Sequence, residues 1–515
     1  MARVWRWLRE DVWEIRFRRY LALLVVAALA AVAVWGGRTL AQEDRSCAPG
    51  VVRPEGSGEC VGVSATAYDF GRPRLAQAVA AIDRENRSLK AGSYVSVALF
   101  EPFTTTDTDN MNDVLHELQG AYLAQYRANH DSNDQTPKIR LVLANPGAAG
   151  DHWEHTVDQL ERMTKGADRL RAVTGIGTST ENNKKAVEAL TGRGVPVIGT
   201  SITADDLANG QGGKDPYPGL ARVSPTNTDE ARALTSFAKV TAGRALLVYD
   251  DPGDPYTRTL KASFDKLLKG SPYEAQPFTP PDDRSQEGTT ANKFRQITHL
   301  VCDTADDTDT ILFAGRHTQL RQFINALGAR GCQKRKFTVL TGDEASYLTG
   351  DKALDRDALR HNLSVRYTSL AHPDAWKKDP AKTGGSAADA EDLEGILRRS
   401  GHEPVGPVGP LALDDGQLII AYDAMRLAVQ GIREATPDGR TVPPLADVGT
   451  QWTLVKGSQR VNGAGGWICL DVHGNPYDKA VPVVELTPDG TSRFVRIAWP
   501  EGRPPAKECL PPSSS

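Results

Sequence analysis

Residues 170–201 read LRAVTGIGTSTENNKKAVEALTGRGVPVIGTS, and their pattern determines the fold class that we expect. Residues 170–174 and 195–199 are short, largely apolar runs, which are typical of buried strands. The amphipathic stretch 180–191 between them predicts a helix, and Gly192 supplies a stop signal at its end. A strand, a helix and a second strand in this order predict a βαβ unit with two parallel strands.

The same alternation continues along the body of the chain. We expect nine strands, at residues 94–100, 139–144, 170–174, 195–199, 220–223, 244–249, 309–314, 336–340 and 362–371. We expect helices between them at 112–129, 151–165, 180–191, 229–240, 255–269 and 318–327. Nine strands are too many for one comfortable sheet, so we predict two lobes, each a parallel sheet flanked by helices. Polar or Pro-rich stretches at 279–290, 373–389 and 403–410 predict surface loops.

Composition and charge limit the class of protein. The chain has 515 residues, of which 40% are hydrophobic, and this supports a large packed core. It excludes a wholly disordered chain and a membrane protein with many spans. Lys and Arg total 61 against 65 Asp and Glu, so the net charge is −4. Because nucleic-acid binders usually carry a basic surplus, we expect no nucleic acid as partner.

The N-terminus predicts a membrane anchor. Residues 21–35 are all apolar, and the stretch 20–37 is near the lower limit for crossing ~30 Å of hydrocarbon. The basic residues in 1–19 place this tail in the cytoplasm and the main body outside the cell membrane, as a single-pass protein. The alternative is a cleavable signal peptide, with Thr39 and Ala41 as the small residues before the cut. We favour an uncleaved anchor, because a polar lead of this length is long for a signal peptide.

Six cysteines follow the predicted span, namely Cys47, Cys60, Cys302, Cys332, Cys469 and Cys509. An even number in an exported chain predicts three disulfides. We expect the sequential pairing 47–60, 302–332 and 469–509, which closes loops of moderate length. The spacing of cysteine and histidine does not match a zinc site, so we expect no metal and no cofactor.

Short segments occur in a fixed order along the chain, at 95–100 (VSVALF), 172–180 (AVTGIGTST), 195–201 (VPVIGTS), 222–225 (RVSP), 247–251 (LVYDD), 421–424 (AYDA) and 465–471 (GGWICLD). Together they resemble the type I periplasmic substrate-binding proteins, in particular the leucine/isoleucine/valine-binding branch, which serves ABC transporters. The resemblance covers most of the chain, from residue 94 to residue 497. It implies two α/β lobes that are joined by three crossings and close on a ligand like a hinge.

The resemblance also implies a division of the chain. Lobe one would comprise residues 91–225 and 372–450, and lobe two would comprise 226–371 and 451–510 with the closing strands. Residues 38–90 lie outside the family core and are expected to form an added collar, with a disulfide and a helix.

Polar side chains follow two neighbouring strands of predicted lobe one. Thr178 and Ser179 come after one strand, and Ser201 and Thr203 come after the next. Ligands of open parallel sheets lie beyond the carboxyl ends of the strands, where hydroxyls and helix N-termini suit a carboxylate. By resemblance, Ser179 and Thr203 lie where amino-acid binders use hydroxyls, and Ser201 where they use the backbone. The alternative is helix capping, because Thr178 and Glu181 have the spacing of a capping box.

Lobe two would supply the other half of the site. The resemblance places an acid, Asp343 or Glu344, against the ammonium group of a ligand, and it adds Tyr256 and His317 to the ligand set. The alternative for the acid is the N-cap of a short helix. The sequence departs from the amino-acid binders at Arg316, where they offer aromatic side chains, and this residue favours a more anionic ligand.

These observations predict a membrane-anchored extracytoplasmic solute-binding protein that holds a small polar ligand, an amino acid or similar, between two hinged lobes. Its partner would be the permease of an ABC importer. The alternative is a ligand sensor or receptor with a signalling partner, or a ligand-free scaffold on the same fold. The sequence offers no catalytic set, so we expect no enzyme.

Overall fold

The computed structural model describes residues 45–131, 135–282 and 286–512, together with residues 20, 24, 25, 27 and 28. The chain divides into two compact units, Met1–Cys47 with Val52–Gly58, and Ala48–Val51 with Glu59–Ser515. The predicted tail at 1–19 and most of the predicted anchor at 20–37 lie outside the described residues. Among the residues that are described, we find no helix with the length and apolar character that a membrane crossing requires.

The described part of the first unit is small. The N–H of Arg53 donates to the carbonyl of Arg45 at 2.8 Å, and the Arg45 guanidinium lies 3.4 Å from the Glu55 carboxylate. Two short strands, β1 (Ser46–Ala48) and β2 (Val51–Val52), lie where the chain passes between the two units.

The second unit contains two large sheets and a small two-stranded one, and the first large sheet has the strand order β3-β5-β4-β6-β7-β8. Its strands are β3 (Val61–Ser64), β4 (Tyr94–Phe100), β5 (Lys138–Asn145), β6 (Leu170–Gly175), β7 (Val197–Gly199) and β8 (Leu220–Arg222). All pairs are parallel except β3 with β5. We call this sheet and its helices the first lobe.

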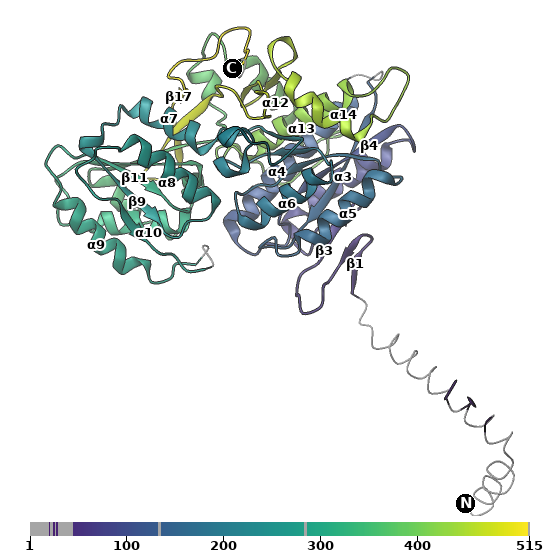
Figure 1. Cartoon of the computed structure of the whole chain (residues 1–515), viewed down its shortest axis with the longest axis horizontal. Coiled ribbons are helices and arrows are strands. Elements are labelled where there is room, and N and C mark those ends of the chain that lie inside the picture. The colour runs from purple at the N-terminus through teal and green to yellow at the C-terminus, as the bar shows by residue number, and fades with distance from the viewer. Residues whose placement is uncertain are drawn as a thin grey trace, which may run out of the picture. The chain divides into compact units, whose positions relative to one another are not determined.

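Helices cover both faces of the first sheet (Figure 1). On one face, α5 (Trp153–Lys165) and α6 (Glu181–Gly192) pack against Ala98 and Phe100 of β4. The other face carries α3 (Ala76–Ser88), α4 (Thr108–His130) and α13 (Gln417–Glu434). Helices α4 and α13 touch through Gly120, because a Cβ at that position would lie 2.2 Å from the Leu418 carbonyl oxygen.

The second sheet has the order β10-β9-β11-β12-β13-β16-β17. Its strands are β9 (Ala245–Asp250), β10 (Gln276–Phe278), β11 (Thr310–Ala314), β12 (Phe337–Thr341), β13 (Leu363–Thr368), β16 (Val481–Leu486) and β17 (Ser492–Ala498). Helices α7 (Asn227–Ala238) and α8 (Pro255–Leu267) pack on one face, and α9 (Thr290–Cys302) and α10 (His317–Gly328) pack on the other. We call this sheet and its helices the second lobe.

The chain crosses between the lobes three times. It leaves the first sheet after β8, returns after β13 to form α13, and crosses again after β15 (Gly466–Ile468) to reach β16. The remaining elements lie along the second and third crossings: α11 (Ala375–Lys378), α12 (Ala387–Leu397), α14 (Leu445–Thr450) and β14 (Val461–Gly463). The predicted two-lobed α/β fold is therefore confirmed.

All nine predicted strands and all six predicted helices occur, with ends that differ by a few residues. The predicted parallel sheets flanked by helices are confirmed, and β3, β16 and β17 join them by antiparallel pairing. A short hairpin can follow a crossing without a helix, whereas a parallel strand needs a long return connection. The predicted loop at 373–389 contains α11, because Trp376 is buried against Trp499 and holds this short helix in place.

Two of the expected disulfides are Cys302–Cys332 and Cys469–Cys509, with Cα atoms 5.6 and 6.3 Å apart. The first joins the end of α9 to the segment after α10. Cys47 and Cys60 are also disulfide-bonded.

Candidate functional site

Ser179 joins the loops that follow β6 and β7 in the first lobe. Its Oγ accepts the backbone N–H groups of Thr203 and Ala204, both at 3.1 Å. The Ser179 hydroxyl, which we expected to contact a ligand, therefore holds its own lobe together. Thr203 is fully buried, and its Oγ1 has no hydrogen-bond partner among the described residues.

Helix α6 begins beside these loops, with Thr180 as its N-cap. The Thr180 side chain accepts the N–H of Asn183 at 3.2 Å. The predicted capping box that starts at Thr178 is therefore wrong by two residues. Thr178 instead accepts the Asn183 side-chain amide through its carbonyl at 2.7 Å.

Glu117 of α4 ties the helix to the loop after β7. The Thr200 hydroxyl donates to Glu117 Oε2 at 2.7 Å, and Ser201 Oγ lies 2.9 Å from Oε1. Ser201 Oγ is also 2.7 Å from Oε1 of Gln417, on α13. Burial raises the pKa of Glu117 to about 7, against the lowering effect of these hydroxyls. Burial and the nearby Glu117 also hold the pKa of Glu101 well above its usual value.

Arg316 connects the two lobes. In the second lobe, its Nε donates to Asp254 at 2.8 Å, and its Nη1 bonds to Glu344 Oε1. From the same side chain, Nη2 donates to the carbonyl of Ser179 in the first lobe at 2.9 Å. His317 contacts the other oxygen of Glu344, through its N–H at 3.2 Å and its Nδ1 at 2.8 Å.

The charges in this cluster are strongly perturbed. Burial alone would raise the pKa of Glu344, but Arg316 and His317 outweigh it and lower the pKa to about 2. Burial, together with Glu344, raises the pKa of Asp343 to about 7. The Arg316 guanidinium lies over the ring of Tyr256, 4.7 Å from its centroid, so an aromatic face completes its surroundings.

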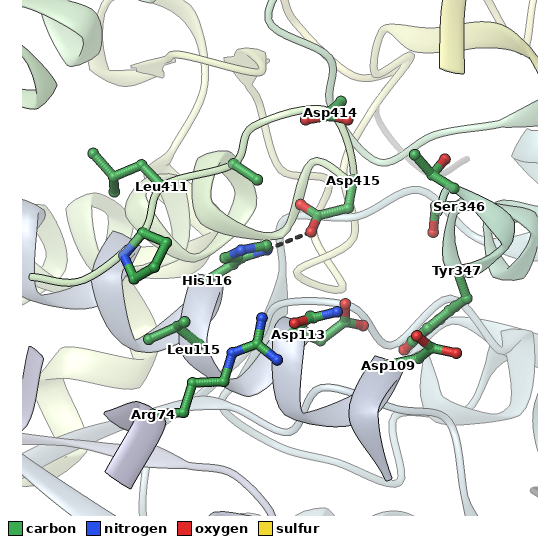
Figure 2. Close-up of a pocket in the computed structure, with 14 residues that line it drawn as sticks. Arg74, Asp109, Asp113, Leu115, His116, Ser346, Tyr347, Leu411, Asp414 and Asp415 are labelled. Carbon is green, nitrogen blue, oxygen red and sulfur yellow. Dashed lines mark hydrogen bonds and ion pairs between the residues drawn. The ribbon is translucent and has the colours of Figure 1, made fainter. Parts of the chain in front are cut away.

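A cavity of about 240 Å³ lies beside this cluster and is walled by both lobes. The first lobe contributes the start of α4 and the loop 410–415, and the second contributes the 3-10 helix η6 (Asp343–Leu348). Figure 2 shows Asp109 and Asp113 of α4 on one wall and Asp414 and Asp415 on another, with Tyr347 of η6 nearby. The cavity wall therefore combines carboxylates from two separate parts of the first lobe.

The carboxylates of the cavity affect one another. Burial, followed by the charge of Asp415, holds the pKa of Asp113 well above its usual value. Asp113 accepts bonds from Tyr347 and, at 3.2 Å, from the Gln417 side chain. Asp415 bonds to His116 (Figure 2). The described residues contain no group of three or more His, Cys, Asp or Glu that could hold a metal ion. Arg74 also lines the cavity, so its wall carries charges of both signs.

The structure brings together four of the eight predicted ligand residues around Arg316, namely Ser179, Tyr256, His317 and Glu344. Ser201 instead faces Glu117. The remaining predicted residues, described above, are Thr178, Thr203 and Asp343. Sequence reasoning missed Asp113 and Glu117. The available signal was acids at Asp109, Asp113 and Glu117, which have the i, i+4 spacing of one helix face.

No protein-family model matches the chain, and no curated protein matches it by sequence. A substrate-binding protein of an ABC transporter from Desulfitobacterium hafniense, in complex with leucine, is similar with a TM-score of 0.55 and 17% identity, covering 78% of this chain and 100% of that one. A leucine-binding protein from Thermotoga maritima has a TM-score of 0.55 and 15% identity, covering 79% and 99%.

A third similar structure is a solute-binding protein of an ABC transporter from Rhodopseudomonas palustris in complex with 3,4-dihydroxybenzoic acid. Its TM-score is 0.52 and its identity 15%, covering 79% of this chain and 97% of that one. At such identities the likeness shows the fold alone. The expected type I periplasmic-binding fold is confirmed.

Proposed function

We propose, from the fold shared with solute-binding proteins of ABC transporters, that this chain is an extracytoplasmic protein that holds a small polar solute between its lobes. The observation that carries the proposal is the cavity of about 240 Å³ with walls from both lobes. It lies slightly below the roughly 300–1,000 Å³ of common small-molecule sites, which suits a solute of the size of an amino acid.

The lining of the cavity supports a solute with a positive group. Asp109, Asp113, Asp414 and Asp415 outnumber Arg74 in the lining, and Leu115 and Leu411 offer apolar contacts. A cation between carboxylates in a partly dehydrated cavity is bound by charge-assisted hydrogen bonds. An amino acid or a similar amine has both the charged group and the apolar body.

We also propose that the apolar stretch at 20–37 anchors the chain in the cell membrane and keeps its main body outside. The arginine-rich flank before it supports this orientation. An anchored solute-binding protein would deliver its solute to the permease of an ABC importer.

A second candidate function is supported by Arg316. Because this side chain already bridges the lobes through Ser179, the closed arrangement holds without a solute. A sensor, or a scaffold without a ligand, would use the fold in this way.

The test is a ligand screen on the full-length protein, with leucine, arginine, agmatine and 3,4-dihydroxybenzoate as probes. A solute at a hundredfold excess over its Kd should stabilise the protein by about 2.7 kcal/mol in thermal unfolding. Leu411→Trp fills the cavity and should abolish this gain. The matched control is Leu300→Trp on α9, a leucine 48% exposed against 39% for Leu411, which should keep the gain. A gain that survives Leu411→Trp, or no gain with any probe, would overturn the proposal.

A further inference from the structure

We propose that Arg316 is a built-in ligand of the cleft, whose guanidinium fills the cation subsite between the lobes and so excludes solutes that need their ammonium group there. The inference rests on the proposed function, because it concerns which solutes the cleft accepts. It makes Arg316 the residue that determines specificity.

The guanidinium is surrounded as a bound cation would be. Arg316 is 8% exposed, and its Nε and Nη1 donate to Asp254 and Glu344 of the second lobe. The Tyr256 ring lies beneath it at 4.7 Å. Carboxylates combined with an aromatic face are the groups that recognise organic cations in binding sites.

The third contact comes from the opposite lobe. Nη2 donates to the Ser179 carbonyl at 2.9 Å, and Ser179 is fixed in the first lobe by its bonds to Thr203 and Ala204. The guanidinium therefore bridges two separately built walls. A solute cation in this position would make the same bridge and would close the lobes in the same way.

Both oxygens of Glu344 are already engaged within the second lobe. Its Oε1 bonds to Arg316, and its Oε2 accepts both the N–H and the Nδ1 contact of His317. The His317 ring stacks on Tyr347 at 4.4 Å, and Tyr347 lines the cavity. The filled subsite thus borders the cavity, and a solute must place its charged group at Asp109 and Asp113 instead.

A purely structural ion pair predicts a different result from a built-in ligand. Loss of a structural pair lowers stability within one lobe, whereas loss of a built-in ligand opens the lobes and leaves a site for a free cation. The decisive experiment therefore measures lobe closure and rescue by a small cation.

We suggest Arg316→Ala in the full-length protein, with the radius of gyration from solution X-ray scattering as the readout. The variant should have a larger radius than the wild type, and guanidinium chloride should restore the smaller radius in a saturable way. Urea, a neutral molecule of the same shape, should require a concentration about tenfold higher, because it lacks charge-assisted bonds.

Two further variants keep the test interpretable. Arg316→Lys retains the charge but loses the forked donors, so it should fold and be partly open. Arg335→Ala removes a guanidinium that donates to the Cys302 and Ala305 carbonyls inside the second lobe, and it should leave the radius unchanged.

An unchanged radius in both Arg316 variants, or equal effects of guanidinium and urea, would overturn the inference. The proposed function would survive that outcome if a solute still stabilised the wild type and Leu411→Trp still abolished this stabilisation. The reverse result, rescue by guanidinium without any solute that binds the cavity, would retain the built-in ligand and refute the proposed function.

Discussion

The free energy of unfolding is expected to fall between pH 4.5 and pH 7. Replacing Glu117 by glutamine is expected to remove much of this fall. Glu117 is 2% exposed, and burial raises its pKa from 4.5 to about 7. The folded protein therefore binds this proton more tightly than the unfolded chain does. The stabilisation is fully present below pH 4.5 and is lost as the pH rises through about 7.

The size of the effect follows from the two pKa values. At about 1.4 kcal/mol for each tenfold change in affinity, a rise from 4.5 to about 7 corresponds to a loss on the order of 3 kcal/mol. Asp343, with a pKa of about 7, contributes in the same direction, so the variant keeps part of the slope. Glutamine retains a side-chain oxygen to accept a bond from Thr200 or Ser201, which limits other losses.

The assay is urea unfolding of wild type and Glu117→Gln at several pH values from 4.5 to 7.5. The matched control is Glu344→Gln, since the pKa of Glu344 is lowered to about 2. Glu344 contributes stability that is present above pH 4.5 and is lost as the pH falls through about 2, so this variant should lower stability across pH 4.5–7.5 and keep the slope that Glu117 contributes. Parallel curves for wild type and Glu117→Gln between pH 4.5 and 7 would refute the reasoning.

Three further outcomes are expected from equilibrium unfolding. Gly120→Ala should destabilise the protein by about 1–3 kcal/mol, because the new Cβ meets the α13 backbone. The control Gly395→Ala on α12, whose Cβ meets a side chain at 3.8 Å, should raise stability by up to about 1 kcal/mol. Equal effects of the two variants would contradict the close helix contact. Replacing Cys302 and Cys332 by serine should cost about 3–4 kcal/mol, as expected for a bridge across 30 residues, and a change below 1 kcal/mol would argue against it. Thr203→Val removes a buried hydroxyl without a partner among the described residues, so stability should stay level or rise by about 1 kcal/mol; a clear loss would indicate a hidden bond.

Much of the architecture could be predicted because strands buried on both faces read as continuous apolar runs. The run at 94–100 coincides with β4, and its neighbours in the sheet have the same character. Helix α9 was missed because its sequence, TANKFRQITHLVC, follows a polar loop without a clear start signal. Its helical state depends on Phe294 and Ile297 packing into the core of the second lobe.

The candidate site was predicted only in part. The carboxyl ends of strands pointed to Ser179 and Glu344, and the fold brings both near the interface of the lobes. Their contact with a ligand stays a prediction. Their partners could not be predicted, because Arg316 and Ser179 are 137 residues apart along the chain. The spacing of acids on α4 was visible, but only the fold shows that this face turns toward the cavity.

The third crossing has a consequence for synthesis on the ribosome. The second sheet is completed by β16 and β17, which end at Ala498. The first lobe is completed only when α13, which ends at Glu434, has been synthesised. Neither half of the molecule can therefore reach its native packing until most of the polypeptide has emerged, although the first strands leave the exit tunnel early. The long interval leaves the edges of both sheets unpaired in the nascent chain, which favours aggregation before the last strands are made.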